Sequence, residues 1–145
     1  MQITIKDVLQ EKGSTVWSVA SSDLVYDALK VFADKDIGAV LVIDDGRLEG
    51  IFTERDYARK GVLKAKSSLD TKVGELMERE MFYVSPADTV EHCMAIMTEK
   101  HVRHVPMLDD GKVVGLISIG DVVKQTISAQ EFTIQQLKKY ISGDM

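Results

Sequence analysis

The chain has 145 residues, of which 45% are hydrophobic and 28% are charged. This balance is typical of a globular domain and excludes a disordered chain, a collagen-like sequence and a coiled-coil rod. The formal net charge of −5 disfavours general binding to nucleic-acid phosphates.

The sequence also indicates the compartment. The only cysteine, Cys93, cannot form an intrachain disulfide. The first twelve residues lack the basic start and apolar core of a signal peptide, and the longest apolar stretch, residues 37–43, is too short to span a membrane. We therefore expect a cytoplasmic protein with no membrane partner.

A repeat with a period of 65 residues organises the chain. Residues 16–60 align without a gap to residues 81–125, and 10 of the 45 aligned pairs are identical. The identities fall largely at turns and helix starts, where backbone geometry restricts the residue type, so we interpret the repeat as a true duplication. A looser match pairs residues 5–9 with residues 73–77, which predicts a short helix before each repeat.

The first repeat predicts the element order β-α-β-β-α. Asp23 is expected to cap the N-terminus of a helix whose apolar residues recur at helical spacing. A buried strand over residues 39–43, a hairpin turn at residues 44–46 and a returning strand over residues 47–53 follow.

The second repeat predicts the same elements in the same order. Asp88 is the expected helix cap, and the strands cover residues 104–108 and 112–118 on either side of a turn at residues 109–111.

Two segments lie outside the repeat. Residues 61–72 form a polar linker in this interpretation. An additional helix is expected after residue 125, because Ser128 and Glu131 have the spacing of a capping box and apolar residues recur beyond them. Such an apolar stripe either packs on the protein's own core or contributes to a subunit interface.

Both returning strands end in the same polar pattern. Thr53 is followed three residues later by Asp56, and Ser118 is followed by Asp121 at the same spacing. A hydroxyl at a helix start can bind phosphate, and a carboxylate there can accept hydrogen bonds from a ribose diol. The simpler alternative is that each pair only caps its helix.

With these motifs in hand, the chain resembles a tandem pair of CBS (cystathionine-β-synthase-type) domains of the stand-alone bacterial type. The resemblance rests on the element order, on the strand over residues 104–109, and on the glycine–hydrophobic–x–Thr/Ser–x–x–Asp pattern that ends both repeats. It covers roughly residues 3 to 126.

The resemblance implies an α/β (α+β) fold in which two β-α-β-β-α motifs pack by their sheets as a pseudo-twofold pair, with a C-terminal helix added. The expected parts of this single module are motif 1 (residues 3–60), a linker (61–72), motif 2 (73–126) and a C-terminal helical extension (127–145).

The resemblance also implies two clefts that bind adenosine-containing ligands, each using residues of both motifs. The hydroxyl and carboxylate come from one motif, and the contacts to the base come from the other. The residues expected for the first cleft are Thr53, Arg55, Asp56, Met81, Phe82 and Arg103. Those expected for the second are Ser118, Asp121, Val16, Trp17, Ala39 and His104.

The two clefts are not expected to be equivalent. Six Lys or Arg residues and only two Asp residues occur between Arg55 and Lys72, whereas Ile119 and Gly120 replace Glu54 and Arg55 in the second repeat. The Asp56 cleft is therefore predicted to prefer a longer phosphate chain or a dinucleotide. The alternative is that the basic run is a solvated linker that contacts no ligand.

Other kinds of site find little support in the residues. His92 and Cys93 are adjacent on a helix and point in different directions, which disfavours joint metal binding, and we expect no metal. We also expect no catalytic residues, because no coherent set of nucleophile, acid and metal ligands is present.

The predicted function is therefore a non-enzymatic sensor that binds AMP, ADP, ATP or NAD as a regulatory ligand and changes its conformation or dimer state. The resemblance implies a homodimer, a disc of four motifs, which signals to an unidentified regulated protein. The competing hypothesis is an interaction scaffold with vestigial clefts.

Overall fold

The computed structural model describes residues 2–143 and divides the chain into two compact units. The first unit is Thr15–Phe82, and the second unit combines Met1–Ser14 with Tyr83–Met145. Each unit contains one copy of the repeat, and the mixed α+β architecture agrees with the predicted fold class.

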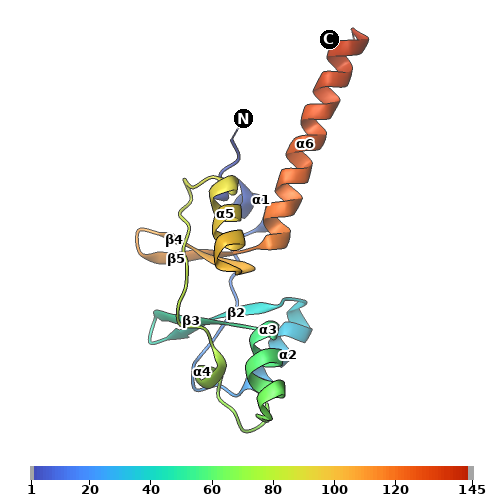
Figure 1. Cartoon of the computed structure of the whole chain (residues 1–145). Helices are drawn as coiled ribbons and strands as arrows, with labels where there is room; N and C mark the ends of the chain where they lie inside the picture. The colour runs from blue at the N-terminus through green and yellow to red at the C-terminus, as the bar shows by residue number, and fades with distance from the viewer. Residues whose placement is uncertain (1, 144–145) are drawn as a thin grey trace. The chain divides into compact units, whose positions relative to one another are not determined.

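The first unit is built on a three-stranded sheet in the order β1-β2-β3 (Figure 1). Strand β1 runs parallel to β2, and β2 pairs with β3 as an antiparallel hairpin. Its elements are β1 (Ser18–Val19), α2 (Val25–Lys35), β2 (Ala39–Asp44), β3 (Arg47–Thr53), α3 (Glu54–Asp56), η1 (Tyr57–Gly61), η2 (Val62–Lys64) and α4 (Val73–Leu76).

The second unit has the equivalent hairpin, here a two-stranded sheet of β4 and β5. Helix α6 continues from the end of β5 and extends well beyond the rest of this unit (Figure 1). The elements are α1 (Ile5–Lys12), α5 (Val90–Lys100), β4 (His104–Asp109), β5 (Lys112–Ser118) and α6 (Ile119–Ser142).

The two sheets differ because of one proline. In the first unit the Leu41 N–H donates to the Trp17 carbonyl at 3.1 Å, which begins the pairing of β1 with β2. The equivalent of Leu41 in the second repeat is Pro106, which has no N–H to donate. The expected first strand of the second repeat is therefore reduced to a single bridge between Val84 and Met107.

The two hairpin turns form as predicted. Asp45 has a φ of 49° and Gly46 a φ of 76°, and Asp110 and Gly111 repeat these values at 53° and 77°. Two consecutive residues with positive φ are the signature of a type I′ turn, which favours Asp-Gly and matches the twist of a hairpin.

The predicted helix caps at Asp23 and Asp88 are wrong by one residue. The N-cap positions are Leu24 in α2 and Thr89 in α5. The Asp23 carboxylate accepts from the Ala20 N–H at 2.8 Å, and the Asp88 carboxylate accepts from the Ser85 N–H at 2.7 Å. Each aspartate closes the turn before its helix, because a short carboxylate serves a turn N–H as readily as a helix N–H.

The predicted start of a separate C-terminal helix at Ser128 is also wrong. Helix α6 runs without a break from Ile119 to Ser142. No Gly or Pro lies between Gly120 and Gly143, and the Thr126 hydroxyl donates to the Val122 carbonyl at 2.9 Å inside the helix. Residues 144 and 145 of the expected extension lie outside the described residues.

The predicted polar linker, residues 61–72, is folded onto the rest of the first unit. The N–H groups of Val25 and Tyr26 donate to the carbonyls of Thr71 and Ser68, each at 2.9 Å. Thr71 is buried. The free N–H groups at the start of α2 therefore find their acceptors in this segment.

Each short helix packs on the other repeat, not on the one that it precedes in the sequence. Ile5 and Val8 of α1 belong to the core of the second unit, although α1 precedes the first repeat. Val73 and Leu76 of α4 belong to the core of the first unit, although α4 precedes the second repeat. The second unit therefore combines two separate segments of the chain, whereas the first unit is one continuous segment.

Two equivalent glycines allow the short helices to approach the sheets. A Cβ atom on Gly115 of β5 would lie 2.7 Å from Cδ1 of Leu9, in α1. A Cβ atom on Gly50 of β3 would lie 2.7 Å from the Glu78 carbonyl oxygen and 3.0 Å from Sδ of Met77. Leu9 and Met77 are paired in the looser sequence match, so the same contact is made in both units.

Alanine substitution tests these close approaches. Gly50→Ala is expected to lower the free energy of unfolding by about 1–3 kcal/mol, because the backbone oxygen of Glu78 cannot easily move away. Gly115→Ala should have a smaller effect, because the end of the Leu9 side chain can rotate. Urea titration of the variants measures both losses.

The matched control is Gly120→Ala on α6, where the added Cβ has no contact closer than 3.6 Å. This change should stabilise the protein by up to about 1 kcal/mol through the higher helix propensity of alanine. Equal stability of the Gly50→Ala variant and the wild type would contradict the packing argument.

Candidate functional site

The first candidate site lies where β3 ends. Thr53 is an N-cap residue whose hydroxyl accepts from the Asp56 N–H at 3.0 Å, while Oδ2 of Asp56 accepts from the Thr53 N–H at 3.0 Å. Lys60 lies 3.3 Å from Oδ1 of Asp56 and 3.4 Å from Oε2 of Glu78. Its ammonium group also donates to the Leu76 carbonyl. The half-buried Asp56 carboxylate therefore lies beside a fixed cation.

The second candidate site repeats this arrangement where β5 ends. The Ser118 hydroxyl accepts from the Asp121 N–H at 3.1 Å, and Oδ2 of Asp121 accepts from the Ser118 N–H at 2.8 Å. Here the cation is Lys12, at the C-terminal end of α1. It donates to Oδ2 of Asp121 and to the Leu116 carbonyl, each at 2.6 Å.

The Asp121 carboxylate is held in its charged form. Its partial burial raises the pKa, but hydrogen bonds from Lys12 and from the Ser118 backbone outweigh burial, and the pKa is lowered overall. The site can therefore present a carboxylate to a hydrogen-bond donor at neutral pH.

His104 belongs to the same group of residues. It is paired with Ser118 across the β4–β5 hairpin and is half-buried. Burial and, to a lesser extent, the nearby charges of Lys12 and Arg103 lower the pKa of His104 to about 4, although the charge of Asp121 opposes them. The imidazole is therefore neutral at pH 7, able to accept one hydrogen bond and donate another.

The other residues predicted for the second site lie in the first unit. Val16 is half-buried and Ala39 is buried at the start of β2. Trp17 is 40% exposed, and Lys35 lies over its ring at 4.4 Å from the centroid. Part of its ring face is thus used within its own unit by a cation–π contact.

The other residues predicted for the first site are divided between the units. Arg55, Met81 and Phe82 belong to the first unit with Thr53, whereas Arg103 belongs to the second. Arg55 and Arg103 have exposed side chains, and Met81 and Phe82 are half-buried.

The sequence motifs at the strand ends do not reveal the two site cations. Lys60 is one member of the basic run, and Lys12 lies outside both repeats. The signal for Lys60 was available, because it follows Asp56 by four residues, which places the two on one face of a helical segment. No local signal connects Lys12 with Asp121, 109 residues away.

Cys93 is a core residue. It is fully buried in the second unit, at the position that Ala28 occupies in the first. Burial raises the pKa of its thiol to about 11, so the reactive thiolate is scarce at neutral pH. Within residues 2–143, no three His, Cys, Asp or Glu side chains are grouped so that they could hold a metal ion.

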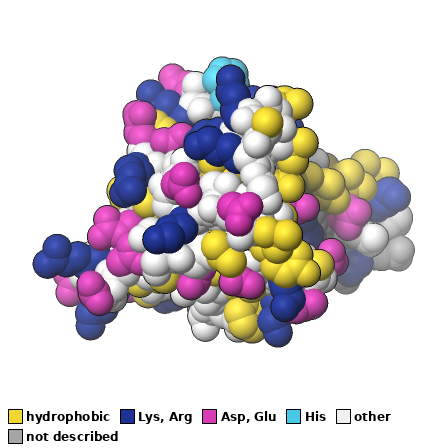
Figure 2. Space-filling model, turned by 90° about the horizontal axis from the view of Figure 1, so that it is seen from below, with side chains coloured by type: hydrophobic (Ala, Val, Ile, Leu, Met, Phe, Trp, Pro, Cys, Tyr) yellow, Lys and Arg dark blue, Asp and Glu magenta, His cyan; other side chains and the backbone are white. Residues whose placement is uncertain are grey.

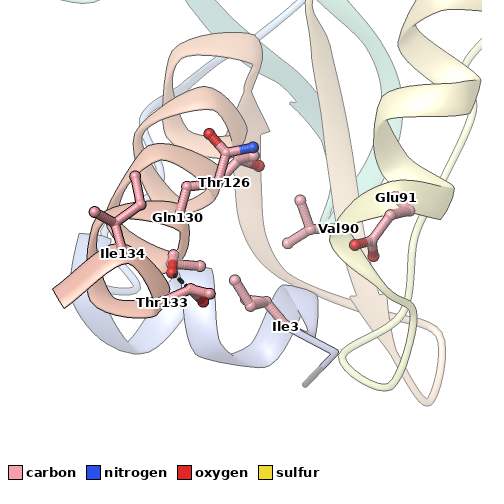
Figure 3. A pocket seen from close by; sticks show the side chains of 8 residues that line it. Ile3, Val90, Glu91, Thr126, Gln130, Thr133 and Ile134 are labelled. Carbon is pink, nitrogen blue, oxygen red and sulfur yellow. Dashed lines mark hydrogen bonds between the residues drawn. The ribbon is translucent and has the colours of Figure 1, made fainter. Parts of the chain in front are cut away.

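A groove of about 400 Å³ lies in the second unit, away from the predicted residues (Figure 3). One wall is α6, with Thr126, Gln130, Thr133 and Ile134, and the opposite side is formed by the start of α5 and by Ile3. The hydroxyls of Thr126 and Thr133 donate to carbonyls of their own helix. The other polar side chains that line the groove are those of Glu91 and Gln130.

The charged side chains are mixed in sign on the face of the molecule that Figure 2 shows, where basic and acidic groups lie beside one another. Among the described residues, no helix is both long and apolar enough to cross a lipid bilayer.

Comparison with known families identifies the architecture. The family profile for the CBS domain matches the chain twice, over residues 5–62 and 73–127. The chain belongs to the CBS domain family. The two matches coincide with the two copies of the repeat, which confirms the resemblance drawn from the sequence.

Other CBS proteins match this CBS pair over most of its length. The mitochondrial CBS domain-containing protein CBSX3 of Arabidopsis thaliana is 39% identical, over 97% of this chain and 72% of its own. A putative signal-transduction protein with CBS domains from Burkholderia ambifaria is 49% identical, with a TM-score of 0.85 over 88% of this chain and 96% of its own.

A more distant structure shares the fold. The CBS domain pair of protein MJ0100, solved in complex with 5′-methylthioadenosine and S-adenosyl-L-methionine, is 24% identical, with a TM-score of 0.79. The alignment covers 89% of this chain and 99% of the MJ0100 chain.

His104 of this CBS pair should make its stability depend on pH. An unfolded histidine has a pKa near 6.5, whereas the folded value is about 4, so the unfolded chain binds more protons between these limits. Stability is therefore expected to fall as the pH decreases through this window, by up to about 3 kcal/mol. Urea unfolding at a series of pH values measures the slope.

His104→Ala should remove this pH-dependent contribution, because it removes the imidazole. Alanine is a suitable replacement, since Ala39 occupies the equivalent position of the first repeat. His92→Ala, on the exposed face of α5, is the matched control and should keep the slope of the wild type. An unchanged slope in His104→Ala would show that another group is responsible.

Proposed function

We propose that this CBS pair is a non-enzymatic sensor that binds adenosine-containing ligands. The observation that carries the proposal is the same strand-end arrangement in both repeats, with a hydroxyl, a charged carboxylate and a helix N-terminus brought together. The MJ0100 complex supports it, because a CBS pair of the same fold holds two adenosine compounds. The ligands we propose are AMP, ADP, ATP or NAD.

The chemistry of each group suits one part of such a ligand. Oxygen atoms of Asp56 and Asp121 can accept hydrogen bonds from a ribose diol. Thr53 and Ser118 offer hydroxyls at helix starts, where the helix dipole favours phosphate oxygens, as at the start of the long helix α6. For the base we retain the contacts that the family resemblance implies, with Met81, Phe82 and Arg103 for one ligand and Val16, Trp17, Ala39 and His104 for the other.

Lys12 and Lys60 indicate how a ligand could compete for the two aspartates. Lys12 and Lys60 neutralise the aspartates when no ligand is bound, and each also contacts a backbone carbonyl. A ligand diol that bonds to the same carboxylate either shares it with the lysine or displaces the ammonium group. A displaced Lys12 or Lys60 lies close to the expected phosphates, where its charge is favourable.

The basic run supports a difference between the two ligands. Arg55 is exposed beside Asp56, whereas Gly120 holds the equivalent position beside Asp121. We therefore propose that the Asp56 site takes the longer phosphate chain or the dinucleotide.

The output of such a sensor is a shift between states. A ligand that contacts both repeats stabilises the arrangement it binds best, by the difference between its affinities for the two states. We propose a cytoplasmic homodimer, the disc of four motifs, that passes this change to a regulated protein. The competing function, an interaction scaffold, predicts no nucleotide binding.

Thermal unfolding with and without nucleotide tests the proposal. A ligand that binds the folded state must raise the Tm by mass action, so at least one of AMP, ADP, ATP, NAD and S-adenosylmethionine should raise it. Asp56→Ala and Asp121→Ala should each reduce this ligand-dependent rise. The two losses, compared for each nucleotide, rank the sites.

Each of these variants also loses a helix cap, which by itself lowers stability by about 0.5–2 kcal/mol. Asp7→Ala is the matched control, because Thr4 and Asp7 form the same capping box at the start of α1. It should lower the Tm and keep the full ligand-dependent rise. If no nucleotide raises the wild-type Tm at millimolar concentration, the scaffold is the better account.

A further inference from the structure

One face of α6 is apolar and uncovered. Val123, Ile127, Leu137 and Ile141 are 44%, 49%, 55% and 82% exposed, and Ile134 is 51% exposed. A row of exposed aliphatic side chains on one helix is unfavourable in water and marks an interaction surface. We name this row, with Gln130 included, the α6 seam.

The seam borders the face that α6 uses within its own unit, and its members Gln130 and Ile134 also line the groove. Val122 is the buried residue of α6, and Thr126, Ala129 and Thr133 follow it at helical spacing along the groove toward α5 (Figure 3). Successive helical residues are rotated by about 100°, so the seam lies about a quarter turn from this inward face. The unit's own core therefore leaves each aliphatic residue of the seam at least 44% exposed.

The spacing of the seam is that of a coiled coil. Its members alternate at intervals of four and three residues, which places Ile127, Ile134 and Ile141 at heptad position a. Val123, Gln130 and Leu137 then occupy position d. Isoleucine at a with leucine at d, as at Leu137, favours a two-stranded coiled coil.

We infer that the α6 seam binds the α6 seam of a second copy of this chain, as a parallel two-stranded coiled coil. A twofold pair of parallel helices places each seam residue against its own copy, so the aliphatic layers match. The Gln130 side chains then meet each other, and an amide both donates and accepts hydrogen bonds. This contact goes beyond the proposed nucleotide binding and does not depend on it.

The charges beside the seam select the parallel direction. Lys124, Glu131 and Lys138 all occupy position e, and the g positions hold Thr126, Thr133 and Tyr140. Parallel helices place e against g of the partner, so each charge faces a neutral side chain. Fully overlapped antiparallel helices would place e against e, bringing Lys124 to the partner's Lys138 and the two copies of Glu131 together, which is repulsive.

Disulfide trapping tests both the contact and its direction, using the full chain in a Cys93→Ala background. Alanine fits there, because Ala28 occupies the equivalent core position. In separate proteins, Gln130→Cys and Leu137→Cys should each give a covalent dimer on mild oxidation, since both positions face their own copies. Lys139→Cys, on the opposite side of the helix, is the control and should remain uncrosslinked.

The mass in solution provides an independent test. Leu137→Glu places two carboxylates against each other in the seam and should lower the mass of the assembly at micromolar concentration. Lys139→Glu should leave the mass unchanged. Because residue 137 is exposed, both variants should retain the helical circular dichroism of the wild type.

Three results would overturn the inference. They are a monomeric wild type, a mass that Leu137→Glu does not change, and a failure of either seam cysteine to crosslink. Crosslinking at only one of the two positions would indicate antiparallel helices, because an antiparallel pair cannot place residues 130 and 137 both opposite their own copies. Loss of nucleotide binding would leave these outcomes unaffected.

Discussion

The close approach of a short helix to a glycine in each sheet is the constraint on which both sites depend. Leu9 of α1 lies against Gly115, and Met77 and Glu78, directly after α4, lie against Gly50. A side chain at either glycine would push the helix away, and the core residues that the helix contributes would pack less closely. The same contact carries Lys12 to Asp121 and brings Glu78 and the Leu76 carbonyl to Lys60. Core packing and site chemistry are thus set by one contact in each unit.

The two sites have the same backbone and capping-box geometry but differ in the charged groups around them. Both capping boxes use the same atoms, whereas the cation comes from α1 in one unit and from the helical turns after Asp56 in the other. His104 adds a neutral imidazole to the second site, where the first has Ala39. A charged ligand would therefore meet different surroundings at two carboxylates of similar backbone geometry. This difference is a physical basis for selectivity between two bound nucleotides.

The parts of the fold that follow from local geometry could be predicted. The hairpins formed at the expected residues because Asp-Gly suits consecutive positive φ values and the flanking runs are apolar. Thr53 and Ser118 cap their helices, in agreement with the simpler interpretation of these motifs. Asp23, Asp88 and Ser128 were misplaced because short polar side chains serve turns, caps and helix interiors alike, and the neighbouring chain decides among them. Pro106 shortened a strand through one missing N–H, an effect visible only once its partner strand is known.

The sequence by itself determined the duplication, the order of elements in each copy, the turns, and the polar residues at the strand ends. These features rest on contacts between residues a few positions apart, where spacing translates directly into geometry. Only the tertiary structure decided which repeat each short helix packs on, because the apolar residues of α1 and α4 suit either core equally well. That choice placed Lys12 beside Asp121, 109 positions along the chain. A contact over such a distance is selected by the packing of whole elements and leaves no mark in the local sequence.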